Sequence, residues 1–176
     1  MDMALKGLKV LDFSTLLPGP FATMYLADLG AEVIHIESPT RPDLIRLMPP
    51  YANGQATAHS YLNRNKHAVA LDLKDPANIE LIKSKISDYD IVIEQFRPGV
   101  MQRLGLDYQT LSEINPRLIY CSITGYGQTG GYQIKQDTIS TMWLCQGSRD
   151  IAGDSTVDHH QWGFKLRILQ EALCIA

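Results

Sequence analysis

The sequence predicts an α/β protein in which a mostly parallel β-sheet is flanked by helices. Two observations predict this class: short apolar runs typical of buried strands alternate with helix-forming segments, and their spacing suits strand–helix–strand crossovers. The chain has 176 residues, of which 45% are hydrophobic, so it is long enough to enclose a core. We therefore expect one domain with this architecture.

The first part of the chain contains two predicted strands joined by a helix. Residues 8–14 (LKVLDFS) form a short apolar run typical of a buried strand, and residues 31–37 (AEVIHIE) form the second. Between them, Pro20 suits the first turn of a helix and Gly30 suits the position after its last turn. A loop with four prolines is predicted over residues 38–58, and loops of this length are often functional.

The second part of the chain continues the alternation. Asp75 and Pro76 are predicted to begin a helix, and Ile79, Ile82 and Ile86 mark its apolar face. The other predicted elements are strands at residues 67–73, 90–96 and 117–127, and two short helices between residues 98 and 116. The pattern predicts a Rossmann-like sheet over residues 1–133, whereas residues 134–176 show no clear periodicity.

Charge and composition narrow the function classes. The net charge of −3 and the pI near 5.9 show no excess of positive charge of the kind that binds nucleic acid or an anionic membrane. The first residues lack the pattern of a secretory signal, and no apolar run approaches the roughly 20 residues of a membrane span. The three cysteines form no CxxC motif. We expect a cytoplasmic protein without nucleic-acid or membrane partners.

Two motifs resemble binding sites but have simpler explanations. Residues 125–130 (GYGQTG) fit a dinucleotide motif, yet they follow the fifth predicted strand and no helix is predicted after them. We therefore favour a glycine loop over an NAD or FAD site, and a nucleotide-dependent oxidoreductase is the less favoured alternative. Asp154, Asp158, His159 and His160 lack the spacing of a helical metal site, so we predict a solvated turn and no metal.

Basic residues are spread around the ends of the predicted strands. They are the segment 63–66 (NRNK), Lys74, Arg97 and Arg103. Individually, each is expected to be a surface charge. Together, they are candidates for an anion pocket at the carboxyl ends of the strands, where open α/β sheets bind ligands.

Three segments, taken together, resemble the class III CoA-transferase family, of the formyl-CoA/carnitine-CoA transferase type. They read LKGLKVLDFSTLLPGPFATMYLADLGAEVIHIESP, NRNKHAVALDLKDP and IVIEQFRPGVMQRLGLDYQTLSEINPRLIYCSITGYGQTG. The similarity runs in order from about residue 5 to residue 133, and the family also includes α-methylacyl-CoA racemases. The resemblance implies the CoA-binding, N-terminal part of a larger two-domain fold. It also implies that full-length relatives are interlocked homodimers of roughly twice this length or more.

The resemblance also implies which residues bind coenzyme A. Many members of the family carry a basic residue at the position of Ser38, and Arg41 is the expected substitute here. CoA or acyl-CoA is expected as a substrate, with no permanently bound cofactor. The ten implied CoA-binding residues are Leu16, Leu17, Pro18, Arg41, Leu71, Lys74, Gln95, Phe96, Arg97 and Arg103.

The catalytic segments of the family are missing from this chain. The resemblance implies an aspartate nucleophile in the transferases, and a His and an Asp in the racemases, within segments similar to AGHDINY and ADFAGG. Neither string occurs here. We therefore predict no catalytic residue in this chain and no transferase or racemase turnover. A catalytically dead CoA-binding module is the alternative function.

A one-base shift in the reading frame recovers both strings. Back-translation from Gln133, with one G restored after its codon, gives QDKAGHDINYVALSG, and the codons of Met142 and Trp143 force the valine. Residues 161–173 similarly give MGIQIADFAGGS in the same frame. We hypothesise a one-nucleotide deletion near the Gln133 codon, an out-of-frame tail over residues 134–176 and a parent on the racemase branch. A genuinely divergent tail is the alternative.

Overall fold

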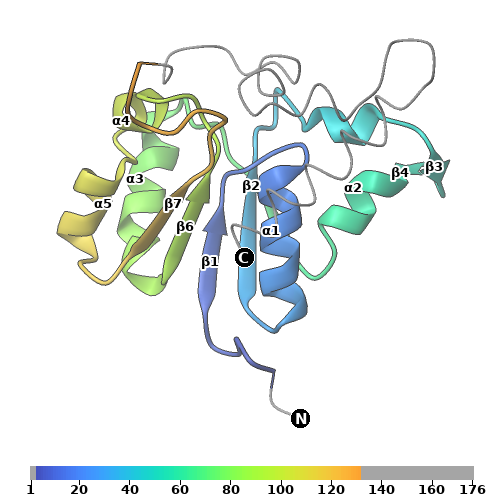
Figure 1. Cartoon of the computed structure of the whole chain (residues 1–176), viewed down its shortest axis with the longest axis horizontal. Coiled ribbons are helices and arrows are strands. Elements are labelled where there is room, and N and C mark those ends of the chain that lie inside the picture. The colour runs from blue at the N-terminus through green and yellow to red at the C-terminus, as the bar shows by residue number, and fades with distance from the viewer. Residues whose placement is uncertain (1–2, 132–176) are drawn as a thin grey trace.

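The computed structural model describes residues 3–131, which contain one five-stranded parallel sheet (Figure 1). The strand order β5-β2-β1-β6-β7 confirms the predicted Rossmann-like α/β architecture. The tail after Gln133, including the predicted turn at His159 and His160, lies outside the described residues. The strands are β1 (Lys9–Asp12), β2 (Glu32–Glu37), β5 (His67–Ala70), β6 (Ile91–Glu94) and β7 (Ile119–Ser122).

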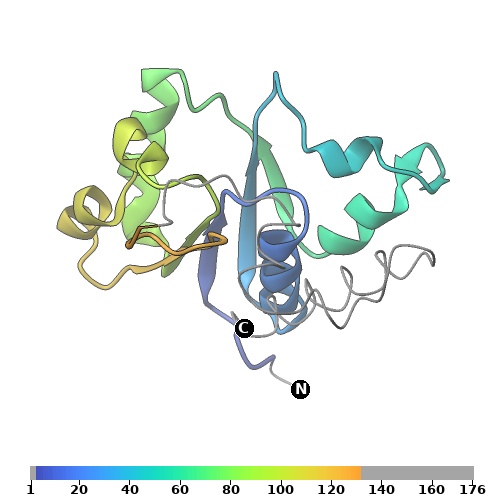
Figure 2. The same cartoon turned by 45° about the horizontal axis from the view of Figure 1, so that its top comes forward.

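Helices cover both faces of the sheet (Figures 1 and 2). Helix α1 lies on one face, and α3, α4 and α5 lie on the other. None of the helices within residues 3–131 has the length and hydropathy needed to span a membrane. The bounds are α1 (Pro18–Asp28), α3 (Pro76–Lys85), the 3₁₀ turn η2 (Ile86–Asp88), α4 (Val100–Leu104) and α5 (Tyr108–Ile114).

The region predicted as a long loop instead contains several short elements. It holds the 3₁₀ turn η1 (Leu44–Leu47), the hairpin strands β3 (Tyr51–Ala52) and β4 (Gln55–Ala56), and helix α2 (Thr57–Leu62). Asn53 and Gly54 make the hairpin turn with φ of 51° and 77°, the positive values that Asn-Gly turns favour. These elements are too short to show a hydrophobic period, and they form an arm beside α1 (Figure 1).

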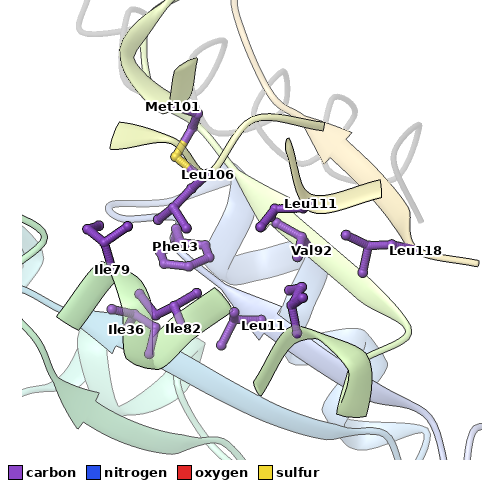
Figure 3. Packing of buried hydrophobic residues seen from close by; sticks show 11 residues of the cluster. Leu11, Phe13, Ile36, Ile79, Ile82, Val92, Met101, Leu106, Leu111 and Leu118 are labelled. Atoms are coloured by element: carbon purple, nitrogen blue, oxygen red, sulfur yellow. The ribbon is translucent and has the colours of Figure 1, made fainter. Parts of the chain in front are cut away.

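The main core lies between the sheet and helices α3, α4 and α5 (Figure 3). Ile79, Ile82 and Ile86 are at most 8% exposed, which confirms the predicted apolar face. Asp75 also caps α3 as predicted, because its carboxylate accepts the N–H of Ala77 at 2.9 Å. A second apolar cluster packs α1 against the opposite face of the sheet.

The sheet has a reversal point at β1. From β1 the chain proceeds through β2 to β5 on one side and then returns to place β6 and β7 on the other. The loops after β1 and β6 therefore leave the same edge of the sheet in opposite directions. Ligands of open α/β sheets bind at this kind of position.

Candidate functional site

The loops that follow β1 and β6 contact each other. Nε2 of Gln95 donates to the backbone oxygen of Thr15 at 2.6 Å. The first turn of α1 also comes close, since a Cβ atom at Gly19 would overlap the side chain of Ser14 and lie 2.8 Å from Oε1 of Gln95. Gly19 thus has no room for any side chain in this arrangement. The contacts bring together six of the predicted residues, Leu16–Pro18 at the start of α1 and Gln95–Arg97 in the loop after β6.

Each of the two loops is held at its start by a buried carboxylate. Asp12, at the end of β1, accepts the N–H of Ser14 at 2.9 Å, and Glu94, at the end of β6, accepts the N–H of Phe96 at 2.7 Å. Asp12 is fully buried and Glu94 is 2% exposed. Burial raises the pKa of Glu94 above its ordinary value. The same device therefore fixes the direction in which both loops leave the sheet.

A cavity of about 390 Å³ lies beside this edge of the sheet. It is lined by Leu73, Lys74, Pro76, Ile79, Glu80, Arg103 and Leu104. The carboxylate of Glu80 pairs with Lys83 at 3.0 Å, which leaves Lys74 and Arg103 as the cations of the lining. The structure therefore unites two predicted basic residues that are 29 positions apart in the sequence. Half-buried Leu71 and Phe96, also predicted site residues, pack against the same apolar cluster as Leu104.

Arg97 and Arg41 lie on exposed loops. Arg41 follows β2, where its backbone N–H bonds Oγ of Ser38 at 3.2 Å. Among the residues that the structure describes, those that line the cavity of Lys74 and Arg103 do not include Arg41. Its substitution for a basic residue at position 38 stays a prediction.

A buried ionic cluster beneath the loop after β1 was not predicted from the sequence. Oδ2 of Asp12 accepts the hydroxyl of Thr23 at 2.6 Å and lies 3.2 Å from Nδ1 of His35 and 3.5 Å from Nζ of Lys66. The Lys66 side chain is only 1% exposed and also donates to the backbone oxygen of Pro20 at 2.9 Å. The expectation of a surface charge was therefore wrong for Lys66.

The cluster extends from His35 to Glu37. Nε2 of His35 lies 3.4 Å from Oε1 of Glu37, an ion-pair distance rather than a well-formed hydrogen bond. Glu37 also pairs with Arg46 at 2.8 Å and with His59 at 3.3 Å. The sequence held one indication of this cluster, because Asp12 and His35 are polar residues inside apolar strands. The register of β1 and β2 places these two residues side by side.

The pKa values within the cluster follow from competition between burial and pairing. Burial would lower the pKa of His35, but its contacts with Asp12 and Glu37 prevail and raise it to about 9. Burial lowers the pKa of Lys66 to about 8 despite the attraction of Asp12. Burial would raise the pKa of Asp12, but the contacts with His35 and Lys66 lower it. The pKa of Glu37 lies well below its usual range because this carboxylate contacts His35, Arg46 and His59.

These shifts predict how stability depends on pH. His35 holds its proton more tightly when folded, so its contribution is complete below pH 6.5 and is lost as the pH rises through 9. The pKa of Lys66 is instead lowered on folding, so burial of its charged form reduces stability below pH 8. This loss of stability disappears as the pH rises from 8 to 10.5. Between pH 6.5 and 8, the free energy of unfolding should therefore fall, by at most about 1.4 kcal/mol per pH unit for this one proton.

Urea unfolding at pH 6.5 and 8 measures this slope. The H35Q variant is the control, because it removes the titrating group while keeping a polar side chain. We expect a shallower fall in H35Q than in the wild type. Equal slopes for the two proteins would contradict the assignment to His35.

The described residues offer cation sites for an anionic ligand but no metal site. Within residues 3–131, no group of three or more His, Cys, Asp or Glu side chains is arranged to hold a metal ion. The exposed cations at the carboxyl edge, Lys74, Arg97 and Arg103, suit phosphate groups, and the cavity wall of Leu73 and Ile79 suits an apolar or aromatic moiety.

Curated CoA-transferases are similar to this chain in sequence. The chain is 46% identical over 127 residues to succinyl-CoA:glutarate CoA-transferase of Homo sapiens, covering 72% of this chain and 29% of that protein. It is 46% identical over 124 residues to acetyl-CoA:oxalate CoA-transferase of Acetobacter aceti, covering 70% and 32%. The chain thus spans about a third of the length of these curated relatives.

A solved structure shares the fold. A CAIB/BAIF family protein from Brucella suis superposes with a TM-score of 0.80 at 36% identity, covering 89% of this chain and 43% of that one. The model of CoA-transferase family III matches residues 5–176, which is nearly the whole sequence. The chain therefore belongs to CoA-transferase family III.

Proposed function

We propose that this chain supplies the CoA-binding part of an enzyme that transfers CoA between an acyl-CoA and a carboxylate. The observation that carries the proposal is the cavity in which Lys74 and Arg103 flank an apolar wall. CoA combines phosphate groups with an adenine ring, so its recognition needs cationic donors beside apolar surface. The loops of Leu16 and Gln95, which contact each other, are proposed to bind the rest of the molecule.

CoA transfer is preferred over racemisation because of the relatives. The two curated relatives described above are named as CoA-transferases. The strings recovered in the shifted frame favour the racemase branch instead, and that reading stays a hypothesis. The chain as written is proposed to bind CoA without turnover, since the sequence contains neither AGHDINY nor ADFAGG.

The gene sequence tests whether residues 134–176 are an out-of-frame tail or a divergent segment. The family match extends over residues 134–176, the segment that the frameshift hypothesis treats as out of frame. Sequencing across codons 130 to 140 tests the hypothesis: a restored base should recover the GHDINY string in frame. A gene sequence that encodes the tail in frame, and from which no restored base recovers GHDINY, would establish a divergent segment. Turnover by the purified, mass-verified chain would contradict the proposed inactivity.

The cytoplasmic location and the acyl-CoA partners are proposals of the same kind. Their support is the family membership and the net charge of −3. The interlocked homodimer that the resemblance implies for full-length relatives stays a prediction.

Binding of CoA to the purified chain tests the proposal directly. We expect micromolar affinity that weakens at high salt, because exposed charges are screened. The R103A and K74A variants should each bind about tenfold more weakly, since each loses a charge-assisted contact worth roughly 1.5 kcal/mol. Isothermal titration calorimetry gives the affinities.

The matched control is K85A, which removes a lysine at the other end of α3 from Lys74. It should leave the affinity for CoA unchanged. A thermal-shift comparison with NAD separates the alternative function, because an oxidoreductase would be stabilised by NAD. No stabilisation by CoA, or an equal loss of affinity in K85A, would contradict the proposed site.

A further inference from the structure

Leu16 has a backbone conformation that leucine rarely adopts. Its φ is 63°, in the left-handed region, where the side chain of a non-glycine residue crowds the backbone. Such a residue persists only where its surroundings fix it, and these residues cluster at functional sites. Leu16 lies in the loop after β1, next to Thr15, which is bonded to Gln95.

The contact that fixes Leu16 comes from Asp43, in the loop after β2. The N–H of Leu16 donates to Oδ2 of Asp43 at 2.8 Å. Oδ1 of Asp43 accepts the N–H of Ile45 at 3.0 Å, so both oxygens of the carboxylate are used. Asp43 is 4% exposed, which is exceptional for a residue in a loop.

Asp43 lies beside a buried apolar cluster and near the positive charge of Lys66. Ile45, which it caps, is 6% exposed and packs in a cluster with Phe21 and Met24 of α1. The ammonium of Lys66 attracts the Asp43 carboxylate, and the same ammonium bonds the backbone oxygen of Pro20 at the start of α1. The carboxylate of Asp43 is thus linked to α1 in two ways, through the packing of Ile45 and through Lys66.

We propose that Asp43 is a positioning residue that holds Leu16 in its left-handed conformation and thereby sets the affinity of the site for CoA. The inference rests on the proposed function, because Leu16 is one of the residues proposed to contact CoA. Asp43 joins the loops after β1 and β2, and the second loop also carries Arg41. Without Asp43, Leu16 relaxes to a negative φ, and its side chain and those of its neighbours leave the binding position.

A double-mutant cycle tests this role in the whole 176-residue chain. Glycine adopts positive φ at little cost, so a glycine at position 16 should need Asp43 much less. We expect D43A to weaken the binding of CoA about tenfold, and D43N, which keeps one acceptor oxygen, to weaken it less. In the L16G background, adding D43A should weaken binding less than threefold. Titration calorimetry measures all affinities.

A second readout does not depend on CoA. Hydrogen exchange of the Leu16 amide, followed by NMR, should be slow in the wild type and fast in D43A, whereas the Phe13 amide, bonded to the Ile93 oxygen at 2.8 Å, stays protected. The matched control is D90A. Its carboxylate accepts the N–H of Lys9 at 2.9 Å at the opposite edge of the sheet, so D90A should change neither readout at the site.

The outcomes are distinguishable. Equal weakening by D43A in the wild-type and L16G backgrounds would overturn the role through Leu16, as would unchanged exchange of the Leu16 amide in D43A. A wild-type chain that binds no CoA would overturn the proposed function and the effect on affinity. The exchange measurement would still decide whether Asp43 holds Leu16.

Discussion

Replacing Asp12 with alanine is expected to destabilise the protein by about 4 kcal/mol or more. The fully buried carboxylate accepts hydrogen bonds from Ser14 and Thr23 and balances the charges of His35 and Lys66. Removing one partner of a buried ion pair leaves the other charged without compensation, which costs roughly 3–5 kcal/mol, and the unpaired hydroxyl and amide add to this. Urea unfolding followed by circular dichroism measures the loss.

Two variants separate the causes of this effect. D12N can keep the acceptor oxygen for Ser14, but an NH2 group then replaces Oδ2, which accepts the hydroxyl of Thr23 and faces His35 and Lys66. Its destabilisation therefore reports the loss of the negative charge together with the Thr23 bond, whereas D12A also loses the bonds of Ser14. D28A removes a carboxylate that pairs with Arg64 in a partly exposed position, and such pairs contribute only about 0–1 kcal/mol. A D12A protein within about 1 kcal/mol of the wild type would show that the buried cluster does not stabilise the fold.

The second large effect is expected for Gly19→Ala. The added methyl group would overlap the side chain of Ser14, which is fully buried, and would crowd Oε1 of Gln95. Neither neighbour is free to move, because Ser14 bonds Asp12 and Gln95 bonds Thr15. We expect a destabilisation of about 3 kcal/mol, at the upper end for overpacked cores, together with weaker binding of CoA.

The matched control for this prediction is Gly131→Ala. A Cβ atom there meets nothing within 4 Å, and no left-handed backbone angle opposes it. The same substitution should therefore change the free energy of unfolding by less than about 0.5 kcal/mol. Similar losses in the two variants would show that the packing around Gly19 is not the cause. Unfolding in urea and titration with CoA measure both effects.

The sequence predicted the sheet because its strands are short and nearly all apolar, with clear capping and turn residues between them. Asp75 and Pro76 begin α3 as expected, and Gly30 follows the end of α1 with φ of 102°. The arm formed by η1, β3, β4 and α2 was missed because elements of two to six residues show no period. Its Asn-Gly turn was the one local signal available.

The buried cluster could not be predicted from local patterns. Asp12, His35 and Lys66 are far apart in the sequence, and their proximity depends on the register that pairs Asp12 with His35. A lysine in a segment such as NRNK resembles a surface charge until the packing of α1 over it is known. The residues proposed to bind CoA were predicted from resemblance to a family, and the structure adds that Lys74 and Arg103 line the same cavity.

The carboxylates that end β1 and β6 have a thermodynamic consequence for recognition. Because Asp12 and Glu94 fix the first residues of both loops before any ligand arrives, the loops lose little conformational entropy when a ligand binds. If CoA binds as proposed, calorimetry should then show only a small unfavourable entropy from ordering these loops. Under the proposed function, a platform that is rigid in advance would hold the coenzyme end of an acyl-CoA in one place, whichever acyl group the molecule carries.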